Sequence, residues 1–127
     1  MKNIFMFIML LITIAGCGSS NGDTSSPPVN PIEQLELVYI SNGSIQCEFD
    51  GYTPSETAQT LIDNGIDVLE SHCGFIAGIS VSAQCGLGNV DINLHSINPQ
   101  NLSDAEELGF KSVSELSEGY EIIECNH

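Results

Sequence analysis

Four polar side chains that could bind a cation recur at alternate positions of one segment. They are Asn89, Asp91, Asn93 and His95. Because alternate residues of a strand share one face, the pattern predicts a polar face rich in oxygen donors, which hard cations such as calcium prefer. A helix–loop–helix calcium motif would need glycine and glutamate where Leu94 and Gln100 stand, and this excludes that motif. The face is either a solvated strand surface or a site for a cation or a partner.

The C-terminal part gathers carboxylates around a single lysine, Lys111. These carboxylates are Asp104, Glu106, Glu107, Glu115, Glu118, Glu121 and Glu124. Like charges gathered in one region cost stability unless something offsets them, so the region could attract a basic protein or calcium.

The residue types needed for catalysis do not form a known motif. The histidines are His72, His95 and His127, and the sequence contains no GxSxG, HExxH or phosphate-binding loop. We therefore predict a non-enzymatic protein without a cofactor.

The first residues predict an exported protein. Lys2 precedes the apolar run Ile4–Ile14, which is short for a membrane span and suited to a secretory signal. The run ends in Ile14-Ala15-Gly16-Cys17, which resembles the lipobox of bacterial lipoproteins. That resemblance implies that residues 1–16 are removed and that acyl chains on Cys17 anchor the protein in a membrane. An ordinary signal peptide or an N-terminal membrane helix is the alternative.

Lipoprotein sorting in Gram-negative cells offers an analogy that predicts which membrane holds the protein. Gly18 follows the cysteine, where an aspartate would favour retention in the inner membrane. The resemblance therefore implies the cell envelope, and the outer membrane rather than the inner.

Composition excludes some partners. The chain of 127 residues has a formal charge of −15, and loss of Lys2 with the signal leaves one lysine against seventeen carboxylates. Nucleic acids and anionic lipid headgroups need Lys and Arg for attachment, so both are excluded as electrostatic partners. The charge favours solubility, or attraction of cations or a basic protein.

The chain divides into three parts. Residues 1–16 are the signal, residues 17–31 are a flexible tether rich in Gly, Ser, Asn and Pro, and residues 32–127 are long enough for one small domain.

Four cysteines remain once Cys17 is assigned to lipid, namely Cys47, Cys73, Cys85 and Cys125. An even number in a small exported chain predicts two disulfides. The spacing lacks the close pairs of a CxxC redox motif or of a structural zinc site.

Alternation and turn residues predict the strands. Residues 35–39 and 45–49 alternate around Asn42-Gly43, which predicts a hairpin with Cys47 on its apolar face. Further strands are predicted at 66–70, 79–84 and 90–95, and a last strand ends at Cys125.

Two helices have capping signals. Thr53-Pro54-Ser55-Glu56 is a capping box with proline at the first helical position, and Gly65 suits the end, so a helix is predicted at 54–64. Ser103 and Glu106 predict a second, short helix that ends at Gly109.

These elements predict a two-layer α+β fold, with a mostly antiparallel sheet, two helices on one face and two disulfides. A ferredoxin-like arrangement is the alternative. If residues 79–84 are a strand, Cys73 and Cys85 are too far apart to be bonded. A parallel crossover unit then favours the pairs Cys47–Cys73 and Cys85–Cys125.

The order of several short motifs resembles that of small uncharacterised exported proteins of Gram-negative bacteria. The motifs are Gln46-Cys47-Glu48, Cys73-Gly74, Cys85-Gly86, and Ala105 with Glu107-Leu108-Gly109-Phe110. That resemblance implies no activity. The sequence as a whole predicts a cell-envelope lipoprotein with an acidic binding or structural domain. An inhibitor of a cationic envelope hydrolase and a calcium-binding surface domain are alternatives.

Overall fold

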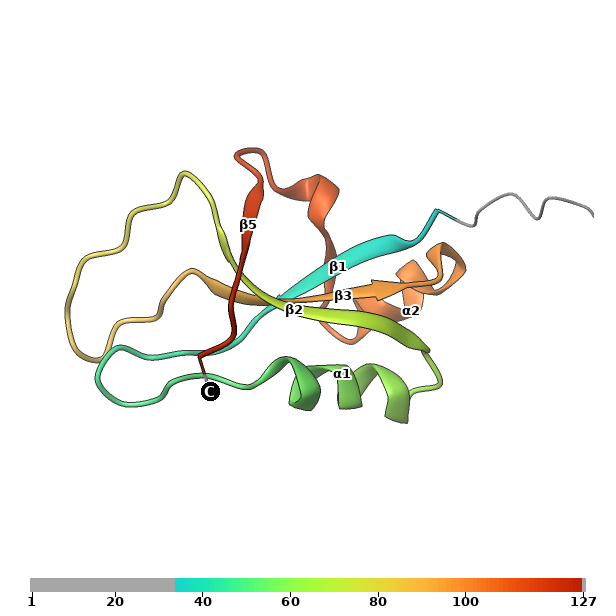
Figure 1. Cartoon of the computed structure of the whole chain (residues 1–127), viewed down its shortest axis with the longest axis horizontal. Helices are drawn as coiled ribbons and strands as arrows, with labels where there is room; N and C mark the ends of the chain where they lie inside the picture. Colours follow the sequence, from blue (N-terminus) through green and yellow to red (C-terminus); the bar gives the residue numbers. More distant parts are fainter. Residues whose placement is uncertain (1–33, 127) are drawn as a thin grey trace, which may run out of the picture.

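The computed structural model describes residues 34–126, which form a five-stranded antiparallel sheet and two α-helices (Figure 1). The strands are β1 (Glu36–Ser41), β2 (Val68–Ile76), β3 (Asp91–Ile97), β4 (Lys111–Ser112) and β5 (Tyr120–Ile123). The helices are α1 (Pro54–Asp63) and α2 (Leu102–Glu107), and the 3₁₀ turns are η1 (Pro99–Asn101) and η2 (Val113–Glu115). The predicted α+β class is confirmed.

The connectivity is that of the ferredoxin-like alternative. The strand order is β4-β1-β3-β2-β5, and every neighbouring pair is antiparallel. β1 and β2 are therefore parallel to each other with β3 between them, so α1 is a crossover helix. The chain order β1-α1-β2-β3-α2-β4 is the split βαβ arrangement. β5 extends this sheet beside β2.

Both helices share one core with the sheet. The core cluster contains Val38, Leu61, Ile66, Ile97, Ala105 and Phe110. Leu61 comes from α1 and Ala105 from α2, and both are completely buried. The two helices therefore lie on the same face of the sheet, as predicted.

Helix α1 begins and ends where its sequence predicts. The Thr53 side chain accepts a hydrogen bond from the Glu56 amide at 3.2 Å, and the Glu56 carboxylate accepts from the Thr53 amide at 2.8 Å. Pro54 occupies the first turn, where a missing N–H costs nothing. Gly65 has φ +81°, the left-handed conformation that ends a helix.

The start of α2 differs from the prediction. Ser103 lies inside the helix, which follows directly on η1. The Asn98 side chain caps η1 by accepting from the Gln100 amide at 2.9 Å. The predicted capping box at Ser103 is wrong because the chain already turns at Asn98-Pro99. The helix ends near Gly109, which has φ +94°.

The predicted hairpin at Asn42-Gly43 is wrong. β1 forms, but residues 46–48 are turns, and Ile45 makes only isolated bridges with Phe49 and Gly88. The Asn42 side chain, nearly buried, accepts from the Ser44 amide at 2.9 Å. This local contact directs the chain away from β1, and Cys47 is exposed instead of lying on an apolar face.

The predicted strand at 79–84 is also wrong. Residues 77–90 form a long loop with Ile79 and Val81 exposed. The strand predicted at 66–70 instead continues as β2 through Cys73 to Ile76. β2 and β3 therefore pair with each other directly, and the loop between them adds no strand to the sheet.

The disulfides are Cys47–Cys85 and Cys73–Cys125, with Cα atoms 5.1 and 5.3 Å apart. The predicted pairs Cys47–Cys73 and Cys85–Cys125 are wrong. Cys73 lies within β2 opposite Ile123 of β5, which brings the C-terminal segment to it. Cys47 and Cys85 join the two loops at residues 42–53 and 77–90, which protrude together at one end of the molecule (Figure 1).

The signal, the lipobox with Cys17 and the tether of residues 17–31 lie outside the described residues, as do Ile32 and His127. Within residues 34–126, no helix has the length and apolar character needed to cross a membrane.

Candidate functional site

The four residues of the predicted polar face do not share one environment. Asn93 and His95 are 1% and 0% exposed, Asp91 is half-buried and Asn89 is exposed. The prediction of a solvated strand face is therefore wrong for Asn93 and His95. The physical reason is that β3 is the central strand, and the face that carries these two residues packs under α1. The four residues contribute to two sites, a polar cleft and a hydrogen-bonded group around His95.

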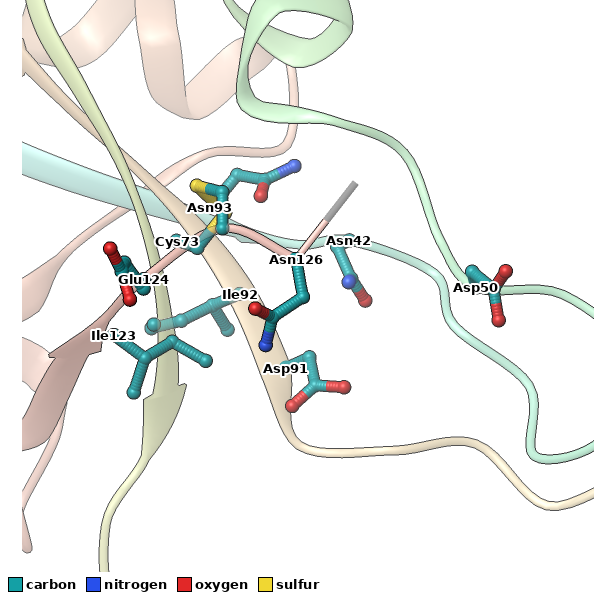
Figure 2. Close-up of a pocket in the computed structure, with 11 residues that line it drawn as sticks. Asn42, Asp50, Cys73, Asp91, Ile92, Asn93, Ile123, Glu124 and Asn126 are labelled. Atoms are coloured by element: carbon teal, nitrogen blue, oxygen red, sulfur yellow. A yellow bond between two sulfur atoms is a disulfide. The ribbon is translucent and has the colours of Figure 1, made fainter.

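The polar cleft has a volume of about 230 Å³ and lies beside the Cys73–Cys125 disulfide (Figure 2). It is lined by Asn42, Asp50, Cys73, Gly74, Asp91, Ile92, Asn93, Ile123, Glu124, Cys125 and Asn126. Figure 2 shows that Asp50 comes from the 42–53 loop, Asp91 from the start of β3, and Glu124 and Asn126 from the segment after β5. Cys73 and Gly74 of β2 also line it, so four chain segments that are distant in sequence form its walls.

The charge of the cleft is negative. Asp50, Asp91 and Glu124 contribute carboxylates, and no lysine, arginine or histidine is among the residues that line it. Lys111, the one basic residue in the described part apart from the histidines, lies on β4, at the opposite edge of the sheet from β5. A cation in the cleft would therefore meet no competing side-chain cation there.

Asp91 is held in place by two hydrogen bonds. Its Oδ2 accepts from Asn89 Nδ2 at 2.7 Å and from Ser44 Oγ at 3.2 Å. Its backbone oxygen accepts from the Asn42 amide at 3.1 Å, which ties the 42–53 loop to β3. The carboxylate is consequently fixed before any ligand arrives.

Asn93 of β3 also holds the 42–53 loop. Its Nδ2 donates to the Tyr52 backbone oxygen at 2.8 Å, and the Tyr52 amide donates to the Asn42 oxygen at 2.7 Å. Since Asn93 is buried, these bonds are shielded from water. The buried asparagine thus shapes the wall of the cleft.

The hydrogen-bonded group around His95 consists of buried His95, half-buried Thr57 and exposed Ser71. His95 Nε2 lies 2.9 Å from Thr57 Oγ1, and Nδ1 lies 2.8 Å from Ser71 Oγ. Thr57 Oγ1 also lies within 3.3 Å of two backbone oxygens of the first turn of α1, to one of which it donates its proton. On this ground we assign the proton of His95 to Nε2, which donates to Thr57, and Nδ1 accepts from Ser71.

This order is that of a nucleophile, a base and an orienting group. Burial, with a smaller contribution from the charge of His72, lowers the pKa of His95 from 6.5 to about 4. An imidazole with this pKa stays neutral at physiological pH and is a weak base, whereas effective general bases titrate near the working pH. We interpret the group as structural, fastening α1 and β2 to the central strand, with the Phe110 ring edge-on to His95 at 5.7 Å.

The acidic residues of the C-terminal part are spread over both edges of the sheet. Glu106 and Glu107 lie on α2 and Glu115 in η2, whereas Glu121 lies on β5. Of this set only Glu124 lines the polar cleft. Within residues 34–126 no group of three or more His, Cys, Asp or Glu side chains is placed to hold a metal ion.

Sequence reasoning missed Asn42, Asp50 and Asn126. Asn42 and Asp50 each precede a glycine with positive φ, Gly43 at +74° and Gly51 at +97°. The sequence therefore indicates turns at both positions, but it does not indicate that the two side chains line a cleft. Asn126 reaches the cleft only because Cys125 bonds to Cys73, a pairing that the sequence did not predict.

Comparisons with known proteins found no relative of the chain. No family model matches the chain, and no curated protein and no solved structure matches it either.

Proposed function

We propose that the chain is a cell-envelope lipoprotein whose acidic, non-enzymatic domain binds a cationic group of a protein partner in the polar cleft. The observation that carries the proposal is the cleft itself, in which Asp50, Asp91 and Glu124 surround a volume of about 230 Å³ without a basic side chain among the lining residues. Such a cleft is suited to one ammonium or guanidinium group.

Electrostatics supports this choice of partner. A cleft lined by one sign of charge focuses the field of the molecule and raises the rate of association with opposite charges. The formal charge of −15 adds to that field over the whole surface. Binding of this kind weakens with salt, because the Debye length falls from about 30 Å at 0.01 M to about 8 Å at 0.15 M.

Two features support the envelope as the setting. Two disulfides in a small domain are typical of an oxidising compartment outside the cytoplasm. The resemblance of Ile14-Ala15-Gly16-Cys17 to a lipobox implies the anchor. An inhibitor of a cationic envelope hydrolase is one form that such a binding protein could take.

The test uses a fluorescent oligolysine peptide and the oxidised full-length chain, with the dissociation constant measured by anisotropy at low and at physiological salt. In the variant Asp50→Asn/Glu124→Gln we expect binding to weaken at least tenfold, since both carboxylates line the cleft. The matched control is Asp104→Asn/Glu107→Gln, which removes the same charge from α2, outside the cleft.

Equal weakening in the two double variants would contradict a role for the cleft, because it would show that only net charge matters. Binding that is insensitive to salt would contradict an electrostatic partner altogether.

A further inference from the structure

An apolar groove lies next to the 42–53 loop and shares none of its lining residues with the polar cleft. It has a volume of about 360 Å³ and lies between the end of β1 and helix α1. It is lined by Ile40 and Ser41 of β1, Gly43 and Tyr52 of the loop, and Glu56, Thr57 and Thr60 of α1.

The groove lies beside the end of β1, where the outer edge of the strand is unpaired within residues 34–126. β4 pairs only with Val38 and Tyr39 of β1, so in the described part of the chain the outer edge at Ile40 and Ser41 has no strand partner. Unpaired amide and carbonyl groups at a sheet edge can accept an extended segment of another chain. Alternate side chains of such a segment would point toward the groove, because successive strand residues face opposite sides.

The aromatic wall of the groove is exposed yet held in position. Tyr52 is 53% exposed, and its ring packs edge-on against Phe49 with ring centroids 5.2 Å apart. The Tyr52 backbone is fixed by its bonds to Asn42 and Asn93. A large apolar side chain could thus be buried against Tyr52 and Ile40 without ordering a flexible wall first, which lowers the cost of binding.

Charge indicates what else the segment carries. Glu56 lies at the rim of the groove, and Asp50 and Asp91 lie along the same loop and the adjacent strand end. A neutral apolar peptide would gain nothing from this field, whereas lysines on either side of an apolar residue would be attracted by it.

From these observations we propose that the groove binds an extended segment of the partner, with one large apolar side chain in the groove and lysines on both flanks. The proposal rests on the cationic partner proposed above and adds a second contact with different physics. Carboxylates would steer the segment to this end of the molecule, and the groove would supply specificity for its apolar residue.

The experiment uses two short fluorescent peptides with the same flanking lysines, one with a central leucine and one with a central serine. Their dissociation constants are measured by anisotropy against the oxidised full-length chain. We expect the leucine peptide to bind roughly tenfold more tightly, which corresponds to about 1.4 kcal/mol. The variant Thr60→Arg, which places a long side chain at the groove, should abolish this preference.

The matched control is Gln59→Arg, which adds the same charge to the same exposed helix one residue away from the groove lining. It should keep the tenfold preference. Equal binding of both peptides to the unmodified chain would overturn the groove proposal while leaving the polar cleft standing. Failure of both peptides to bind at low salt would overturn the groove proposal and the proposed function together.

Discussion

His95 of the central strand and Thr57 of α1 are joined by a hydrogen bond of 2.9 Å beneath the helix. His95 has no exposed surface, so its ring also fills volume in the core beside Phe110. The contact is therefore both a polar link and a packing contact between the sheet and its larger helix.

Replacement of His95 by alanine tests this double role. His95→Ala would leave a cavity and remove the partner of both Thr57 and Ser71. We expect a loss of about 3 kcal/mol in the free energy of unfolding, measured by denaturant titration. The control His72→Ala concerns a half-exposed histidine and should change stability by no more than about 0.5 kcal/mol. Similar losses in both variants would contradict the structural role of His95.

The same histidine predicts a dependence of stability on pH. Because burial lowers the pKa of His95 to about 4 in the folded state, the unfolded state binds a proton between pH 6.5 and pH 4 that the folded state does not. Stability therefore falls as the pH decreases through this window, and at pH 5 the loss relative to pH 7 is about 2 kcal/mol. Denaturant titrations at these two pH values measure it.

The control for this dependence is a pair of glutamine variants. His95→Gln removes the titrating group, so most of the loss between pH 7 and pH 5 should disappear. His72→Gln removes the other described histidine and should retain most of it, since the charge of His72 is the smaller cause of the lowered pKa. An unchanged loss in His95→Gln would show that other groups cause it.

The contact between β2 and β5 depends on a missing side chain. A Cβ at Gly74 would lie 2.6 Å from the Glu121 backbone oxygen and 2.7 Å from Leu94 Cδ1. We expect Gly74→Ala to lower the free energy of unfolding by about 2 kcal/mol, because backbone of β5 must move. Gly88→Ala is the control, since a Cβ there meets nothing within 4 Å and Gly88 is not among the positive-φ glycines. A neutral Gly74→Ala would contradict the close approach of the two strands.

Local signals predicted α1 correctly, whereas the local signals at Asn42-Gly43 and at Ser103 did not give the predicted hairpin and capping box. The capping box at Thr53 and Glu56 and the left-handed Gly65 define α1 through contacts that lie within the helix and its ends. The fold class followed from the same kind of signal, because strands and helices of these lengths pack as two layers.

Features that depend on pairing between distant segments were not predicted. Alternation at residues 79–84 gives the period of a strand but no partner, and the loop there is held by Gln46, whose side chain bonds to Ser82 and Gln84. Polar alternation in β3 suggested solvent, yet His95 is buried because Thr57 and Ser71 satisfy both ring nitrogens. Hydropathy alone does not distinguish a solvated polar residue from a buried one that has partners.

The two disulfides should differ in their reactivity with a dithiol reductant. Cys47 and Cys85 are both exposed on loops, whereas in the other bond only Cys125 is exposed and Cys73 is 6% exposed within the sheet. Attack by a thiolate requires access to sulfur, so we expect the Cys47–Cys85 bond to be reduced first under native conditions. Timed alkylation and peptide mass mapping would identify which cysteines are labelled at each stage.

Removal of each bond separately gives the matching stability test. The sequence separations of 38 and 52 residues predict nearly the same entropic contribution, about 4 kcal/mol for each bond. Cys73→Ala/Cys125→Ala should nevertheless cost more than Cys47→Ala/Cys85→Ala, because it also loses a buried contact that holds the C-terminal segment against β2. Unfolding titrations of both double variants measure the difference. A larger loss of unfolding free energy for Cys47→Ala/Cys85→Ala would show that the 42–53 and 77–90 loops, and not the edge of the sheet at β5, limit the stability of the domain.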